Sequence, residues 1–169
     1  MSSKQFIRTL AILTVLCLNI GCDQISKDFA RQKLDYHQEI NLVNEYLTLT
    51  KVENTGAFLG LGSTLPQPLK VLLLTVIPLF VLGLAVIYLL TRKNLSNISM
   101  LGISFIAGGG IGNIYDRIVH GSVTDFLHID FVIFKTGIFN FADVSIVAGM
   151  CMIVLDSYFN RKIVKYKHK

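Results

Sequence analysis

The sequence predicts an all-α membrane protein with four transmembrane helices and a small extracytoplasmic β-sheet between the first and second helices. Of its 169 residues, 52% are hydrophobic and 16% are charged, and the mean hydropathy is +0.57. Soluble domains carry about 25% charged residues, so this chain is too apolar to fold in water alone. The apolar residues also gather in four runs, each near the roughly 20 residues that a bilayer-spanning helix needs.

The predicted spans cover about 6–25, 69–90, 95–115 and 139–159. The second is the least ambiguous, because its interior holds no ionisable residue. The first apolar run closes with Gly21-Cys22, a pair that is also found where lipoprotein signal peptides end. A signal peptide would precede a soluble body, but three more spans follow here. We therefore interpret the first run as a retained helix and expect residues 1–169 to form a single integral membrane domain.

Basic residues predict which ends of the spans are cytoplasmic. They precede the first span and follow the second and fourth, in segments without Asp or Glu: Lys4, Arg8, Arg92, Lys93, Arg161, Lys162, Lys165, Lys167 and Lys169. By the positive-inside rule both termini are cytoplasmic, and the segments 27–68 and 117–138 face outward. The net charge of +5 is thus explained by topology and by contact with membrane lipids. We expect no nucleic-acid partner.

The first outward segment carries the predicted sheet, over about 38–66. YLTLTKV alternates with period two and is rich in β-formers, and the Asn-Thr-Gly and Gly-Leu-Gly after it are turn signals. The outward segment between spans three and four is short and amphipathic, and it has strand or interfacial character.

Glycines are concentrated in the third span, at Gly108, Gly109, Gly110 and Gly112. A glycine run can cradle a phosphate, but this one lies within an apolar span. We interpret it as a surface for close helix packing, with Gly108 and Gly112 as a pair of small residues four apart.

Polar and ionisable side chains gather at the outward ends of spans one, three and four: Asp23, Asn113, Asp116, Arg117, Asn140 and Asp143. Such residues are costly inside a membrane and indicate a functional site. Asp23 and Lys27 are four apart, so they share a helix face and can pair. Asp143 has no basic residue within one helical turn, so its carboxylate needs a partner from elsewhere in the chain.

The partner that we infer for Asp143 is Asp125, which lies in the apolar outward segment before span four. Two neighbouring carboxylates cannot both ionise cheaply, so they share a proton. Such a pair can act as general base and general acid on a water that attacks an amide. This is aspartic-protease chemistry, and we expect neither a metal nor a cofactor. Asp130 is the nearest alternative to Asp125, and spacing alone does not exclude it.

A different class of function is a non-enzymatic small polytopic membrane protein, a transporter or scaffold subunit with functional intramembrane Asp residues. Proton and ion sites of that kind more often line a path near the midplane of the membrane. Here the carboxylates cluster at one surface and the second span is apolar, which disfavours conduction.

Five motifs follow one another along the chain: DQISK at 23–27, NTGAF at 54–58, GGGIGNIYDR at 108–117, VTDF at 123–126 and FNFAD at 139–143. In this order, on a chain with four spans, they resemble the motifs of signal peptidase II, the lipoprotein signal peptidase family of bacterial membrane aspartic proteases. Ser26 stands where Thr is common in the family, and the chain has no Trp. Neither departure touches the motifs of the acid pair.

The resemblance implies that the catalytic pair is Asp125 with Asp143, rather than Asp130. It also implies two supporting sets. The residues that would bind substrate are Asn54, Gly56, Asn113, Arg117 and Asn140. Those that would support the pocket are Asp23, Lys27, Asp116, Gly108 and Gly112.

The implied activity is removal of the signal peptide from diacylglyceryl-modified prolipoproteins, with a cut just before the lipidated cysteine. We expect a multi-pass monomer in the bacterial cytoplasmic (inner) membrane, in contact with membrane lipids and lipid-modified prolipoproteins. Its active site would lie near the outer face.

Overall fold

The computed structural model describes residues 2–36, 38–44, 46–131 and 133–167, with side chains described up to Asn160. The helices are α1 (Ser3–Lys33), α2 (Gln67–Val71), α3 (Ile77–Thr91), α4 (Asn97–Val119) and α5 (Phe141–Lys167). A π-helical turn, Leu72–Val76, joins α2 to α3, and a 3₁₀ turn covers Phe58–Gly60. The strands are β1 (Glu39–Val43), β2 (Leu47–Asn54), β3 (Val123–Phe131) and β4 (Phe134–Lys135). The basic side chains expected to follow the fourth span, Arg161 to Lys169, lie outside the described part.

Four helical stretches are long and apolar enough to cross a membrane: Ser3–Lys33, Gln67–Thr91, Asn97–Val119 and Phe141–Asn160. This confirms the prediction of a mainly helical protein with four apolar helices. Within α3, all of which is described, Leu89 is the one buried side chain, so nearly the whole surface of this helix is available to lipid. The first helix continues beyond the predicted run to Lys33, which keeps Lys27 and Arg31 helical.

Two of the helices, α1 and α4, begin with side-chain caps. Ser2 and Gln5 form a capping box at the start of α1, because each side chain bonds the backbone of the other residue. Ser96 accepts a hydrogen bond from the Ser99 backbone N–H at the start of α4. At the same end of the bundle, Arg8 on α1 donates to the Leu89 carbonyl near the end of α3 over 3.0 Å. The side chain of α1 thereby satisfies a carbonyl that α3 leaves unpaired.

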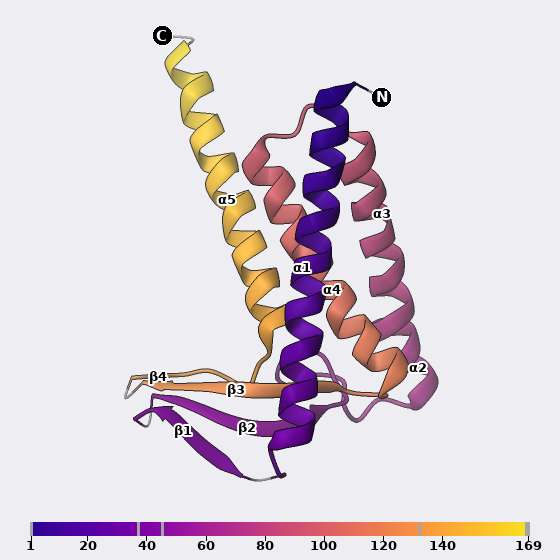
Figure 1. Ribbon diagram of the computed structural model, residues 1–169, viewed down its shortest axis with the longest axis vertical. Coiled ribbons are helices and arrows are strands. Elements are labelled where there is room, and N and C mark those ends of the chain that lie inside the picture. Colours follow the sequence, from indigo (N-terminus) through magenta and orange to yellow (C-terminus); the bar gives the residue numbers. More distant parts are fainter. Residues whose placement is uncertain (1, 37, 45, 132, 168–169) are drawn as a thin grey trace.

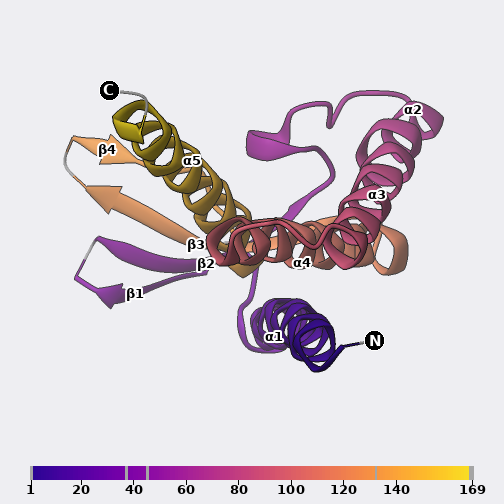
Figure 2. The ribbon, with the colours of Figure 1, turned by 90° about the horizontal axis from the view of Figure 1, so that it is seen from above.

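Both termini lie at one end of the helices, and the sheet lies at the other (Figure 1). Seen along the helices, α4 is central, with α1 on one side and α3 and α5 diverging from it on the other (Figure 2). The catalytic candidates sit where the sheet meets α4, α5 and α1. The architecture thus brings residues from distant parts of the sequence to one end of the bundle.

Glycines allow α4 to approach all three neighbouring helices. Gly102 and Gly109 lie against α5, Gly110 faces Leu82 of α3, and Gly108 and Gly112 face Asn19 and Asp23 of α1, respectively. A Cβ atom added at Gly108 would lie 2.7 Å from the Asn19 Cβ atom, and one added at Gly112 would lie 2.5 Å from Asp23 Oδ2. Neither position has room for a methyl group, and small residues at such crossings are the rule in membrane helix packing.

The sheet has the order β1-β2-β3-β4, and its neighbouring strands are antiparallel. The prediction placed it between the first and second apolar helices, but β3 and β4 come from the connection between α4 and α5. The predicted all-α class leaves out this four-stranded sheet, and the prediction of a sheet from one segment alone misses β3 and β4. The physical reason is that one edge of β2 would be left unpaired by β1 alone, and β3 supplies its partner. A small apolar cluster of Ala30, Leu34 and Phe126 packs the sheet onto the end of α1.

Candidate active site

Asp125 and Asp143 come together where β3 approaches the first turn of α5. Asp125 is 4% exposed on β3, and Asp143 is in the first turn of α5. Asn140, which is fully buried, contacts both residues. Its Nδ2 donates to Asp125 Oδ1 over 2.6 Å, and its Oδ1 accepts from the Asp143 backbone N–H over 3.0 Å. One amide side chain therefore joins the strand that carries one acid to the helix that carries the other.

The sequence FNFAD forms this arrangement as a helix cap. The Asn140 backbone N–H donates to Asp143 Oδ2 over 3.2 Å, which completes a reciprocal pair with the bond from the Asp143 N–H to Asn140 Oδ1. It has the pattern of a capping box, with Asn in place of the usual Ser or Thr and Asp in place of Glu. The Asp143 carboxylate is thus oriented by the start of its own helix.

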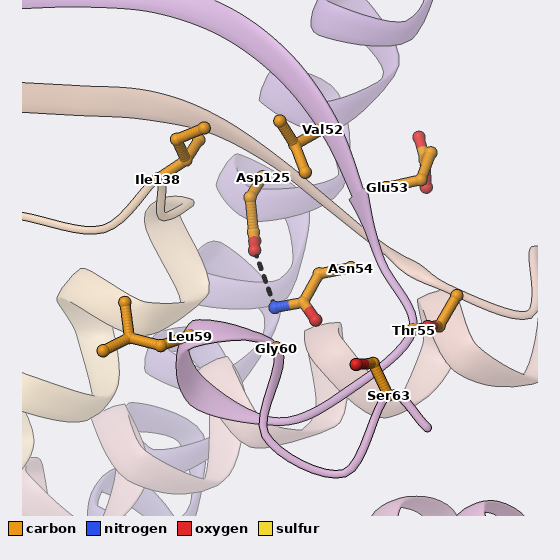
Figure 3. A pocket seen from close by; sticks show the side chains of 9 residues that line it. All are labelled: Val52, Glu53, Asn54, Thr55, Leu59, Gly60, Ser63, Asp125 and Ile138. Atoms are coloured by element: carbon orange, nitrogen blue, oxygen red, sulfur yellow. Dashed lines mark hydrogen bonds between the residues drawn. The ribbon is translucent and has the colours of Figure 1, made fainter. Parts of the chain in front are cut away.

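The other oxygen of Asp125 is held by Asn54, at the end of β2. Asn54 Nδ2 donates to Asp125 Oδ2 over 3.0 Å (Figure 3). Asn54 Oδ1 accepts from the Gly56 N–H over 2.9 Å. The second bond closes a local turn of the kind that Asn favours. Asn54 Nδ2 also donates to the Ala57 carbonyl over 3.1 Å, so the side chain fixes the turn and the acid together.

Gly56 has a position that only a residue without a side chain can occupy. A Cβ atom there would lie 2.5 Å from the backbone of Gly60, so the chain folds back closely on itself after β2. Arg117 Nη2 donates to the Gly56 carbonyl over 2.8 Å, and Arg117 Nη1 donates to the Asn113 carbonyl over 3.2 Å. The guanidinium group thereby ties the turn to α4 while lying within electrostatic range of both Asp125 and Asp143.

A pocket of about 280 Å³ opens beside Asp125 (Figure 3). Its lining residues come from the end of β2, the turn after it and the approach to α5: Val52, Glu53, Asn54, Thr55, Leu59, Gly60, Ser63, Asp125 and Ile138. Val52, Leu59 and Ile138 form the apolar part of its wall, and the other lining residues include the acids Asp125 and Glu53.

Burial raises the pKa of Asp125 from its ordinary value of 3.8 to about 6. That net rise includes a contribution from the negative charge of Asp143, and it is reduced by the hydrogen bonds from Asn54 and Asn140, which favour the ionised form. A carboxyl group with this pKa can hold or release a proton close to neutral pH, as a general acid or base requires.

Asp143 is joined to a buried lysine through Asn113 on α4. Asn113 Nδ2 donates to Asp143 Oδ1 over 3.0 Å, and Asn113 Oδ1 accepts from Lys27 Nζ over 2.8 Å. The resemblance implied a substrate-binding role for Asn113 and a supporting role for Lys27. In the structure, the Asn113 amide group lies between Lys27 and Asp143.

Lys27 is fully buried with two carboxylates around it. Its Nζ lies 2.7 Å from Asp23 Oδ2 and 2.9 Å from Asp116 Oδ2. The other oxygen of Asp23 accepts from the Ala142 N–H at the start of α5 over 2.9 Å. The pairing of Asp23 with Lys27 predicted from their spacing is present, and the cluster connects α1, α4 and α5 directly behind the two acids.

Sequence reasoning missed three polar residues of this cluster. Gln24 Nε2 donates to Asp23, to Asp116 and to the Gly112 carbonyl. Arg31 Nη2 pairs with Asp116 over 2.9 Å, and Arg31 Nε donates to Thr124 Oγ1 over 2.9 Å. Thr124 immediately precedes Asp125, so Arg31 holds the acid-bearing strand against α1 and α4. One feature of the sequence could have indicated Arg31: it is four residues after Lys27, and so lies on the same face of α1.

Asp130, the alternative considered for the acid pair, lies near the other end of β3. There it pairs with Lys135 across the β3–β4 hairpin over 2.6 Å. Among the described residues, no three His, Cys, Asp or Glu side chains are grouped so that they could hold a metal ion. The chemistry that the site offers is that of two carboxylates, amide donors and an apolar pocket.

Sequence comparisons with known proteins identify the family of this chain. The family model of signal peptidase II matches residues 15–159. The lipoprotein signal peptidase of Clostridium acetobutylicum is 31% identical over 144 residues, which cover 85% of this chain and 90% of the relative. That of Chlorobium luteolum is 36% identical over 151 residues, which cover 84% of this chain and 86% of the relative.

A solved structure described as a bacterial membrane enzyme aligns with a TM-score of 0.79 at 22% identity and covers 89% of each chain. A second one aligns with a TM-score of 0.76 at 20% identity. At these identities the likeness concerns the fold, which is that of a multi-pass membrane protein. On the family match and the two sequence relatives, which cover most of both chains, this chain belongs to the signal peptidase II family.

Proposed function

We propose that the chain is a membrane aspartic endopeptidase that removes the signal peptide from diacylglyceryl-modified prolipoproteins, cutting just before the lipidated cysteine. The observation that carries this proposal is the contact of Asn140 with both Asp125 and Asp143, which holds two acids from separate elements at one site. The substrate class is supported by the names of the relatives, which are lipoprotein signal peptidases. These relatives favour the peptidase over a transporter or scaffold subunit.

In the proposed reaction, Asp125 and Asp143 share one proton. The ionised carboxylate removes a proton from water, whose oxygen attacks the scissile carbonyl carbon, while the protonated carboxyl group donates its proton to the carbonyl oxygen. The resulting tetrahedral diol then collapses. The C–N bond breaks, the leaving amine takes the proton that came from water, and the diol returns one proton to the other carboxylate. The pair ends in its starting state, and its proton belongs to the pair rather than to one residue.

The residues implied to bind substrate act in this proposal by shaping the site. Asn54 and Asn140 orient Asp125, and Arg117 holds the turn at Gly56 that forms one wall of the pocket. The pocket beside Asp125 would receive side chains next to the scissile bond. Its apolar wall suits the small and aliphatic residues of a signal peptide better than charged ones.

The proposed topology has both termini in the cytoplasm and the acid pair near the outer face of the bacterial cytoplasmic membrane. Lys4, Arg8, Arg92 and Lys93 stand in segments without Asp or Glu, next to the N-terminus and after α3. The sheet lies at the opposite end of the helices from both termini (Figure 1). The substrate would arrive laterally as a membrane-spanning helix with its lipid still in the bilayer. The protein would act as a monomer in contact with lipid.

The test is a gel-shift cleavage assay with purified protein in detergent and a lipid-modified prolipoprotein. Wild type, Asp125→Asn and Asp143→Asn are compared, and unlipidated precursor is the substrate control. We expect cleavage by the wild type alone, and only of the lipidated precursor. Substantial cleavage by a folded Asp125→Asn or Asp143→Asn variant would reject the acid pair. Failure of folded wild type to cleave would reject the proposed function.

A further inference from the structure

Three asparagines direct their NH₂ groups at the carboxylates of the proposed pair. Asn54 and Asn140 donate to the two oxygens of Asp125 over 3.0 and 2.6 Å, and Asn113 donates to Asp143 Oδ1 over 3.0 Å. A half-turn of an amide group exchanges its NH₂ and its oxygen. Each of these side chains therefore acts as a donor only as long as another contact fixes its orientation.

In each case the amide oxygen is held by a group that can only donate. The Gly56 N–H holds Asn54, the Asp143 N–H holds Asn140, and the Lys27 ammonium holds Asn113 over 2.8 Å. The first two donors are backbone groups within a local turn or helix cap. The third differs, because it is a charged side chain on another helix.

We propose that Lys27 is a positioning residue for the reaction, which acts through Asn113 to hold the Asp143 carboxylate in place. The ammonium group has three donors and no acceptor, so Asn113 Oδ1 must face Lys27 and Asn113 Nδ2 must face Asp143. A rotated Asn113 would place its oxygen against the carboxylate and its NH₂ group against the ammonium. This inference rests on the proposed function, because it takes Asp143 as one of the two acids.

The surroundings of Lys27 hold its ammonium group in one position. The side chain is fully buried, and its Nζ is held by Asp23 over 2.7 Å and by Asp116 over 2.9 Å in addition to Asn113. The ammonium donates hydrogen bonds to Asp23 and Asn113 and forms an ion pair with Asp116. The absence of a side chain at Gly112 leaves the space that Asp23 occupies. A lysine with this many contacts cannot move away and release Asn113.

The experiment is a double-mutant cycle in a charge-balanced background. Asp23→Asn is the reference, because Lys27→Gln then removes the ammonium without leaving an additional buried charge. The cycle compares Lys27→Gln, Asn113→Ala and the two combined, all with Asp23→Asn, for kcat and KM with lipid-modified prolipoprotein. Gln24→Leu serves as a matched control, since Gln24 belongs to the same cluster but does not contact Asn113.

We expect Lys27→Gln to lower kcat about a hundredfold with little change in KM, as a misplaced catalytic group does. Once Asn113 is replaced by Ala, Lys27→Gln should have no further effect on kcat, whereas Gln24→Leu should have the same effect in both backgrounds. Equal losses from Lys27→Gln with and without Asn113 would overturn the proposal, because Lys27 would then act independently of Asn113. An unchanged kcat would overturn it as well.

A second comparison leaves Lys27 in place and applies even where the Lys27 variants fail to fold. Asn113→Asp keeps an acceptor for the ammonium but has no donor for Asp143, and Asn113→Leu has neither. If Asn113 serves only to satisfy the buried lysine, Asn113→Asp remains active. We expect instead that Asn113→Asp stays folded and loses kcat at least as severely as Asn113→Leu. Cleavage by wild type in the same assay separates these outcomes from failure of the proposed function.

Discussion

The amide nitrogen of Asn140 lies 2.6 Å from Asp125 Oδ1, while the amide oxygen of the same side chain caps the helix that begins with the turn of Asp143. The two bonds have separable consequences. The cap contributes to the stability of α5, and the bond to Asp125 aligns an acid.

Asn140→Ser should separate these two roles, because serine is a good helix cap but is too short to reach Asp125. We expect this variant to keep the cap of α5 and to lose about a hundredfold in kcat. Asn140→Ala should lose the same activity and, in addition, about 1 kcal/mol of stability. Thermal unfolding in detergent and the cleavage assay measure the two effects. Wild-type kcat in Asn140→Ser would show that the bond to Asp125 is dispensable.

The raised pKa of Asp125 predicts how stability depends on pH. Its folded-state pKa of about 6 lies above its ordinary value of 3.8, so the folded protein binds this proton more tightly than the unfolded chain. The stabilisation that protonation gives is fully present below about pH 4 and is lost as the pH rises to about 6.

The side chain of Asn in the Asp125→Asn variant does not titrate. Asp125→Asn should therefore gain stability relative to wild type over this range, by up to about 3 kcal/mol at 1.36 kcal/mol per pKa unit. Unfolding curves between pH 4 and 7 test this, and a constant difference would contradict it.

Two glycines offer a matched test of helix packing. A methyl group at Gly112 would lie 2.5 Å from Asp23 Oδ2, whereas one at Gly83 of α3 meets no atom within 4 Å. We expect Gly112→Ala to destabilise the protein by about 1–3 kcal/mol, as overpacking does. Gly83→Ala should be neutral or slightly stabilising, because alanine favours a helix. If thermal unfolding finds both variants equal to wild type, the close contact between α1 and α4 is absent in the membrane protein.

Arg31 should stabilise the fold through its buried partners, Asp116 and Thr124, rather than through its exposed partner, Asp28. Arg31→Gln breaks the pair with Asp116 and the bond to Thr124, and bonds of this kind to charged groups contribute about 2 kcal/mol each. Asp28→Asn removes the other partner of Arg31, which is 60% exposed, and should change stability by less than about 0.5 kcal/mol. Free energies of unfolding in detergent compare the two. Similar losses in both variants would mean that Arg31 does not anchor β3.

The four apolar helices could be predicted from hydropathy, because a membrane-spanning helix is a long run of apolar residues. The sheet was anticipated only in part. Alternation along 46–52 predicts a strand, but nothing local tells that its second neighbour is β3, more than sixty residues away. Strand pairing between distant segments depends on how α4 carries the chain back across the bundle. Hydropathy does not contain that information.

The site could be predicted where its chemistry is local to a motif. Asn140 was implied to bind substrate, and in the structure it precedes α5 and caps it. Arg31 and Gln24 escaped notice because charged and amide residues near the end of a helix are usually solvated. Only the packing of α1 against α4 turns them inward, and such tertiary contacts are not visible in one sequence.

The order of elements along the chain has a consequence for biosynthesis. Both acids of the proposed pair come after α4, and the earlier elements supply residues that hold them, among them Lys27, Asn54 and Asn113. A nascent chain that ends before Phe141 has inserted three of its apolar helices and carries Asp125, yet it lacks Asp143 and the helix that Asn140 caps. The chain therefore becomes able to cleave only when α5 has been synthesised. An incomplete nascent chain cannot cleave the precursors in the same membrane.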